Sequence, residues 1–168
     1  MFLNTKYQIK YSVALIFAGA IVLQAFHMVE HFAQLHQHAF LGLSIPESNG
    51  LITALNLEEI HWIYNLTYFI MLMFVFKYCS FFDLQNRTDG QKVAILSFNT
   101  AFFLQGYHLV EHTVRMAQYF NTGCTPCVGI LGIFFDGVYL HFVVNFLVFV
   151  FPFCAFFVFG FYKKCFRK

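Results

Sequence analysis

Apolar residues fill four stretches of the chain, and each is long enough to cross a lipid bilayer, which takes about 20 residues of helix. The four stretches are Ile9–Leu35, Leu57–Phe81, Val93–Phe120 and Leu131–Phe161. Pro152 lies inside the fourth stretch and is expected to kink that helix or mark its inner third, because proline removes one helical hydrogen bond. Pro46 and Pro126 lie in the predicted connections. The pattern predicts an all-α fold, an integral membrane four-helix bundle.

The composition agrees with a chain that is surrounded by lipid. Of its 168 residues, 60% are hydrophobic and 11% are charged, whereas a soluble domain carries about 25% charged residues. Its 26 phenylalanines and 9 tyrosines would cover a soluble protein of this size with aromatic surface. The lipid bilayer is therefore the expected partner, and a homo-oligomer or a larger membrane complex is compatible with the same surface. No run of charge indicates a nucleic-acid partner, and residues 1–168 are expected to form a single membrane domain.

Lysine and arginine residues indicate the orientation of the four helices. Most lie before the first stretch, between the second and third, or after the fourth: Lys6, Lys10, Lys77, Arg87, Lys92, Lys163, Lys164, Arg167 and Lys168. The first connection has no basic residue other than histidine, and the third has only Arg115 at its start. Because cytoplasmic segments carry the excess of lysine and arginine, both termini are expected in the cytoplasm. The first and third connections then lie outside.

A nine-residue motif occurs twice. Leu23–His31 returns 81 positions later as Leu104–His112, with six of nine residues identical, including two histidines and a glutamate. A second motif, H-x-x-x-N, begins at His61 and returns 80 positions later at His141. These offsets predict two tandem two-helix repeats, at about residues 9–81 and 93–161. Because each repeat has two spans, both should share one orientation, with a pseudo-two-fold axis along the membrane normal.

Polar residues of the repeated motifs share one face of each helix. On the first helix, an arc of roughly 120° carries Gln24, His27, Glu30, His31 and Gln34. The matching arc on the third helix carries Gln105, His108, Glu111, His112 and Arg115. His27 lies about 25 Å of helix beyond Lys10, and His61 about 24 Å before Lys77. We therefore expect one polar layer, in the outer third of a bilayer core about 30 Å thick.

The residue types of this layer predict a metal site. Histidines at i and i+4 on one helix can bind one metal ion, and a third histidine from a neighbouring helix completes a three-ligand set. The candidate ligands are His27, Glu30, His31, His61, His108, Glu111, His112 and His141. They suit two mononuclear sites, one in each half, or a dinuclear site flanked by the glutamates. Asn65 and Asn145 are expected to orient ligands, and imidazole with carboxylate suits iron, copper or zinc.

Three other interpretations of the histidines were weighed. H-x-x-E-H also occurs in a class of zinc proteases, but that class does not explain two copies facing each other in lipid. Haem b needs one histidine from each of two helices, which His27 and His108, or His61 and His141, would supply. Histidines one turn apart on the same helix are unfavourable for this arrangement, because the haems that they bind would collide. The remaining interpretation is a set of interior histidines bonded to glutamine, asparagine or glutamate.

The two halves differ at two polar positions. Glu58 corresponds to Val138, and Gln34 corresponds to Arg115. Arg115 follows Glu111 by four residues, a spacing at which opposite charges pair on a helix. Such a pair would withdraw Glu111 from a metal, so the sequence predicts a stronger site in the first half than in the second.

Two cysteines lie close together in the third connection, at Cys124 and Cys127. This connection is expected outside the cell, where disulfides persist, so a structural disulfide is predicted. Thiol–disulfide chemistry and metal transfer by the reduced pair are the alternatives.

Taken together, these patterns predict an integral membrane metalloprotein with a His/Glu metal site near the extracytoplasmic face. It is expected to be a redox enzyme or the metal-bearing subunit of a membrane oxidoreductase complex. The alternatives are a non-catalytic metal carrier or accessory subunit, and a b-haem electron-transfer subunit.

Overall fold

The computed structural model describes residues 11–52, 57–79, 84–85 and 87–166, most of which are helical, with no strand among them. The α-helices are α1 (Tyr11–Ala39), α2 (Glu58–Cys79), α3 (Asp89–Thr122), α4 (Gly137–Val158) and α5 (Phe161–Phe166). Two 3-10 helices, η1 (Ile45–Glu47) and η3 (Leu131–Ile133), lie in the first and third connections. The prediction of an all-α fold is confirmed.

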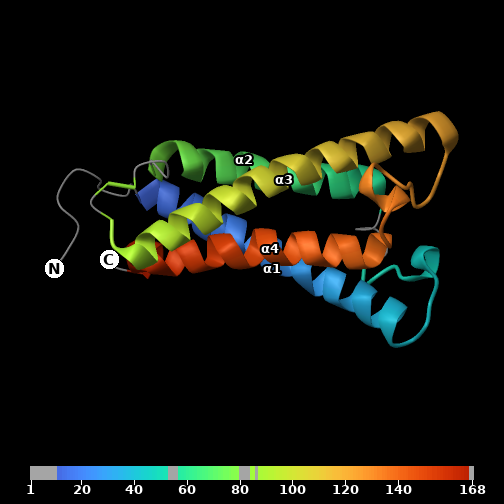
Figure 1. Ribbon diagram of the computed structural model, residues 1–168, viewed down its shortest axis with the longest axis horizontal. Helices are drawn as coiled ribbons and strands as arrows, with labels where there is room; N and C mark the ends of the chain where they lie inside the picture. The colour runs from blue at the N-terminus through green and yellow to red at the C-terminus, as the bar shows by residue number, and fades with distance from the viewer. Residues whose placement is uncertain (1–10, 53–56, 80–83, 86, 167–168) are drawn as a thin grey trace.

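The helices α1 to α4 run side by side along the long axis of the molecule (Figure 1). All four are long and apolar enough to cross a membrane, which supports an integral membrane protein. At one end, α1 and α3 finish and α2 and α4 begin, and we call this the histidine end. The other end, where α1 and α3 begin, is called the opposite end. Large apolar side chains are exposed along the helices, such as Phe26 and Phe103, as lipid-facing positions require.

The helix boundaries differ from the predicted stretches where polar residues cap the helices. The fourth helix begins at Gly137 rather than Leu131, because Asp136 accepts hydrogen bonds from the backbone N–H groups of Val138 and Tyr139. The third begins at Asp89, four residues early, because Thr88 and Gln91 form a capping box in front of it.

The remaining boundary predictions concern the first two stretches and the prolines. The first helix continues to Ala39, past the predicted end at Leu35. The predicted boundaries Ile9 and Phe81 lie outside the described residues. Pro152 is buried within α4, which continues to Val158. As predicted, Pro46 and Pro126 lie in connections.

Aromatic side chains fill the core at the opposite end. The fully buried ring of Phe17 makes edge contacts with Phe98, Phe156 and Phe161, at centroid distances of 5.6, 5.3 and 5.0 Å. Each such contact contributes about 0.5–1.5 kcal/mol beyond the burial of its area. Near the middle of the bundle, the buried hydroxyl of Tyr68 donates to the backbone oxygen of Val148 at 2.6 Å. The apolar core therefore occupies one half of the bundle, and the polar layer occupies the other.

Candidate metal centre

The structure buries the predicted polar layer at the histidine end. All eight candidate ligands are 9% exposed or less: His27, Glu30, His31, His61, His108, Glu111, His112 and His141. On α1, the intervening Phe26 and Val29 are 73% and 54% exposed. Because 3.6 residues make one turn, the histidines share the buried face and the apolar residues share the outer face. The helical period thus brings residues from four helices into one layer.

Five of the histidines form two groups that share one member. In each group, the ligand nitrogens lie within 4.8 Å of one another. The first group is His27, His31 and His61, and the second is His61, His108 and His112. The ring of His61 lies between them, with centroids 4.6 Å from His27 and 4.4 Å from His112. Such groups of buried imidazoles can hold metal ions.

Within each group, the two histidines of one helix turn the same ring atom toward each other. The Nε2 atoms of His27 and His31 are 3.1 Å apart, and those of His108 and His112 are 3.2 Å apart. Nδ1 of His31 donates to the amide oxygen of Gln34 at 2.8 Å, an oxygen that can only accept. The proton on Nδ1 leaves the lone pair on Nε2, which is the state that a metal ligand requires.

Below the histidines lie two amide pairs. Gln24 donates to the side chain of Asn145, and Gln105 donates to that of Asn65, both at 3.0 Å. Nδ2 of Asn145 is also 3.4 Å from Nε2 of His108, while Asn65 donates to the backbone oxygen of His61 at 2.9 Å. The asparagines therefore contact the histidine layer from the side that faces the opposite end of the bundle.

Glu30 and Glu111 lie outside both groups, and each holds a connection at the histidine end. Oε1 of Glu30 accepts from the backbone N–H of Ile52 at 3.0 Å, and Oε1 of Glu111 accepts from that of Ile130 at 2.8 Å. Hydrogen bonds from backbone N–H groups to an ionised carboxylate are strong and hold the side chain in position. The structure thus offers the two glutamates a role in fixing loops, in place of the metal contact that the motif indicated.

Two glutamines, each two turns beyond its glutamate, hold the same loops. The side chain of Gln37 both donates to and accepts from the backbone of Gly50, at 2.9 and 2.8 Å. Gln118 makes the same two contacts with Gly129, at 3.4 and 2.8 Å. Both glycines have positive φ, near 74° and 72°, a conformation that favours glycine. Each loop is therefore fixed to its helix by one glutamate and one glutamine.

We expect Gly129→Ala to destabilise the protein by about 2 kcal/mol more than Gly123→Ala. Both glycines have positive φ, so alanine has a similar backbone cost at each. A Cβ at Gly123 would meet open space, whereas one at Gly129 would overlap Oε1 of Glu111. Displacing Glu111 would break its hydrogen bonds to Ile130 and Leu131, and bonds to a charged group are worth about 1.5–3 kcal/mol. Denaturant unfolding in detergent measures the difference, and equal losses would contradict a stabilising role for the bonds between Glu111 and the loop.

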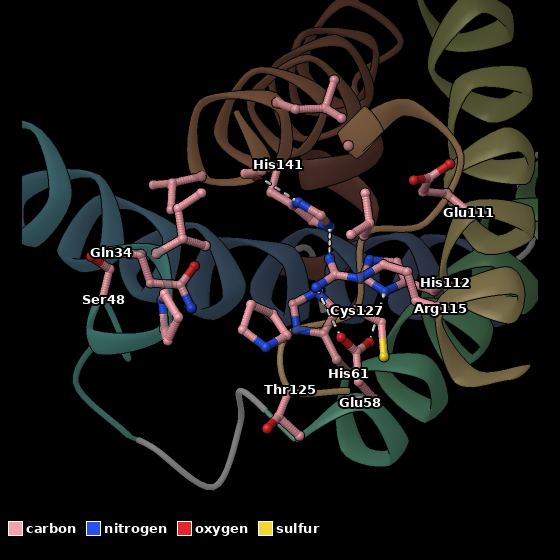
Figure 2. A pocket seen from close by; sticks show the side chains of 18 of the residues that line it. Gln34, Ser48, Glu58, His61, Glu111, His112, Arg115, Thr125, Cys127 and His141 are labelled. Atoms are coloured by element: carbon pink, nitrogen blue, oxygen red, sulfur yellow. Dashed lines mark hydrogen bonds and ion pairs between the residues drawn. The ribbon is translucent and has the colours of Figure 1, made fainter. Parts of the chain in front are cut away.

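Arg115 pairs with Glu58, so the predicted pairing with Glu111 is wrong. Nη2 of Arg115 lies 2.8 Å from Oε1 of Glu58, and the other oxygen of Glu58 lies 3.9 Å from Nδ1 of His112. Glu111 is occupied by the loop amides. The two positions at which the halves differ, 58 and 115, therefore contact each other across the interface of α2 and α3 (Figure 2).

His141 belongs to neither group. Its Nδ1 donates to the backbone oxygen of Gly137 at 2.7 Å, which leaves Nε2 as an acceptor. Nη1 of Arg115 donates to that Nε2 at 2.8 Å. Both ring nitrogens are thus in hydrogen bonds. The ring of His141 lies 5.4 Å from that of His108 and 5.1 Å from that of His112, but it is His61 that joins these two in a group of ligand nitrogens.

A cavity of about 400 Å³ opens beside the second group. Figure 2 shows His61, His112, Arg115, Glu58 and His141 around it. Much of its remaining wall comes from the first and third connections, and includes Ile45, Pro46, Ser48, Thr125, Pro126, Cys127, Val128 and Phe135. The cavity therefore has a polar floor on the helices and a largely apolar rim on the loops.

The loops at this rim are locally braced. Cys124 and Cys127 form the predicted disulfide, and Cys127 is buried. Before η1, the backbone N–H and hydroxyl of Ser44 both donate to Glu47, which lowers the pKa of that exposed carboxyl. His38, at the end of α1, pairs with Asp136 at 3.0 Å and joins the first connection to the start of α4. These contacts give the cavity a defined entrance.

The repeat motifs alone did not reveal several of these roles. Gln37 and Gln118 are separated by the same 81 positions as the histidine pairs, so extending the comparison would have found them. Tyr64, whose ring stacks on His27 at 4.3 Å and whose hydroxyl donates to Leu23, has no aromatic counterpart at Val144. That contact depends on the packing of α1 against α2, which no single-helix pattern reports.

Comparisons of this chain with protein-family models, with curated proteins and with solved structures find no match.

Proposed function

We propose that this protein is an integral membrane metalloprotein whose two groups of histidines hold transition-metal ions. The observation that carries the proposal is the convergence of five buried imidazoles, with ligand nitrogens within 4.8 Å in each group. Removing several imidazoles from water without partners of opposite charge is costly, and polar clusters inside membrane bundles mark functional sites. A bound cation would use their lone pairs together.

The same function is supported by a pseudo-two-fold arrangement of two tandem repeats, which we also propose. The pairs Gln24–Asn145 and Gln105–Asn65 have equal lengths of 3.0 Å. The two i, i+4 histidine pairs have Nε2 separations of 3.1 and 3.2 Å. Exchanging α1 with α3 and α2 with α4 therefore converts each of these amide pairs, and each of these histidine pairs, into the other. A dinuclear centre near the pseudo-axis is compatible with this arrangement, although His61 departs from the symmetry because its counterpart His141 is in neither group. His61 would serve both metals as a bridging imidazolate, since a neutral imidazole has only one lone pair.

Small ions fit this arrangement better than haem b does. The ring of His61 lies 4.6 Å from that of His27 and 4.4 Å from that of His112. A porphyrin would have to separate rings that are already in contact. Imidazole ligands suit iron, copper or zinc, and the cysteine pair is withdrawn from the set by its disulfide.

The cavity favours a redox enzyme, or the metal-bearing subunit of one, over a closed structural site. Catalytic metal sites keep an open position that a substrate can reach, and His61 and His112 both line the cavity. At the opposite end, the aromatic cluster around Phe17 closes the bundle. With both termini in the cytoplasm, as the lysine and arginine bias favours, the site would be reached from outside.

Metal analysis of the purified protein tests the proposal. We expect the wild type to contain iron, copper or zinc and to show no Soret band. The double variant His27→Ala/His31→Ala should lose the metal of the first group, because it removes two of the three imidazoles there.

The matched control is His36→Ala/His38→Ala, which removes two imidazoles from the same helix outside both groups. It should retain the wild-type metal content. A Soret band would favour the b-haem alternative, and unchanged metal in His27→Ala/His31→Ala would overturn the ligand assignment. Iron or copper would support a redox role, whereas zinc would favour the carrier alternative.

A further inference from the structure

We propose that the cavity binds a small carboxylate, which is held by the side chains of His112 and Arg115 beside the metal centre. This inference rests on the proposed metal site and adds the class of ligand that the site would take. Three observations support it: two buried donors, the positions of the carboxylates, and the composition of the cavity wall.

Two buried N–H groups on adjacent turns of α3 have no hydrogen-bond partner within the described part of the chain. They are Nε of Arg115 and Nδ1 of His112, which lies 3.9 Å from a carboxylate oxygen of Glu58, beyond hydrogen-bond distance. His112 is 1% exposed, and both residues line the cavity. Since Nε2 of His112 faces His108, the Nδ1 side carries the proton when Nε2 binds a metal. A buried donor without an acceptor costs about 1–3 kcal/mol, so a ligand with acceptor oxygens would stabilise both groups.

The charges of the layer favour an anionic ligand. The described residues include three buried carboxylates, Glu30, Glu58 and Glu111. Glu30 and Glu111 accept from loop amides, and Glu58 pairs with Arg115. The three carboxylates and Arg115 leave a net charge of −2 in the layer, because the backbone amides that Glu30 and Glu111 bind are neutral. Two divalent ions would bring four positive charges, so a further negative charge is favoured in a medium of low dielectric constant. A carboxylate entering the cavity supplies that charge and two acceptor oxygens.

The apolar rim accommodates the rest of such a ligand. Ile45, Pro46, Val128 and Phe135 line the cavity away from the polar floor. A carboxylate head group at His112 and Arg115 would leave an alkyl chain against these side chains, where burial is worth about 0.8 kcal/mol per CH₂. The carboxylate could come from solution or from the lipid phase, and chain length distinguishes the two sources.

Calorimetric titration of the full chain in detergent, loaded with zinc, tests the proposal with acetate and hexanoate as probes. Arg115→Lys keeps a cation for Glu58 but removes the Nε–H, and should weaken acetate binding about tenfold or more. The matched control, Arg87→Lys, makes the same change outside the cavity and should bind as the wild type does. Tighter binding of hexanoate indicates a lipid-derived ligand, and equal binding indicates a water-soluble one.

Zinc content, measured in the same samples, separates the two proposals. Metal-loaded wild type that binds neither probe, or Arg115→Lys that binds acetate like the wild type, would overturn the carboxylate site alone. Wild type that takes up no zinc, iron or copper would overturn the proposed function and this inference with it. Should Arg115→Lys fail to fold, Glu58→Val/Arg115→Gln removes the same donor without leaving an unpaired charge, and should show the same loss.

Discussion

His61→Ala is expected to abolish metal binding in both histidine groups. His61 is the one residue that the two groups share, so its removal leaves each with the two imidazoles of a single helix. Two ligands at i and i+4 hold a metal more weakly than the three or four that zinc, iron and copper sites use. Metal content should fall from one ion for each group to a small residual fraction, as measured by elemental analysis of protein purified without added metal.

His141→Ala is the matched comparison, because it also removes a buried imidazole from the same layer. The two nitrogens of His141 already bond to Gly137 and Arg115, so this variant should retain its metal. Circular dichroism and gel filtration of both variants would verify that each one is folded. Retention of metal in His61→Ala would contradict the shared role of His61. Loss of metal in His141→Ala in addition would assign that role to His141.

The layer of histidines could be predicted from the sequence because each helix contributes to it separately. The period of 3.6 residues places His27 and His31 on one face of α1, and the distances from basic residues place His61 at a similar depth. None of these steps needs the packing of one helix on another. The capped start of α3 was missed because Thr88 precedes the apolar stretch that defined the helix. That of α4 was missed because Asp136 lies within an apolar stretch that begins at Leu131.

The partners of the charged residues could not be predicted in the same way. A spacing of four residues suggested that Arg115 pairs with Glu111, but spacing describes only neighbours on one helix. Glu58 lies at the start of another helix and reaches Arg115 through the packing of α2 on α3. Glu111 shares the polar arc of the histidines, yet it bends to loop amides whose positions depend on a glycine with positive φ.

Glu58→Val is expected to destabilise the protein by about 3 kcal/mol, because it leaves the guanidinium of Arg115 without its carboxylate. The side chains of the pair are 7% and 13% exposed, and removing one partner of a buried ion pair typically costs about 3–5 kcal/mol. Of the two partners that Arg115 now has, Glu58 and His141, only the neutral His141 would remain. Denaturant unfolding in mixed micelles measures the loss. Glu59→Val, the same substitution one residue later at a partly exposed position, is the control and should cost less than about 1 kcal/mol.

Adding Arg115→Gln to Glu58→Val should recover most of the lost stability, although it is a second change in the same buried site. The double variant places valine and glutamine at positions 58 and 115, which are the residues of the other half, Val138 and Gln34. Replacing both members of a buried pair by residues that suit the site is often close to neutral, so its stability should lie within about 1 kcal/mol of the wild type. The coupling between the two substitutions, about 2 kcal/mol or more, would measure the interaction between the side chains of Glu58 and Arg115. Additive losses would mean that Arg115 is stabilised by other contacts, and that the asymmetry between the halves does not depend on this pair.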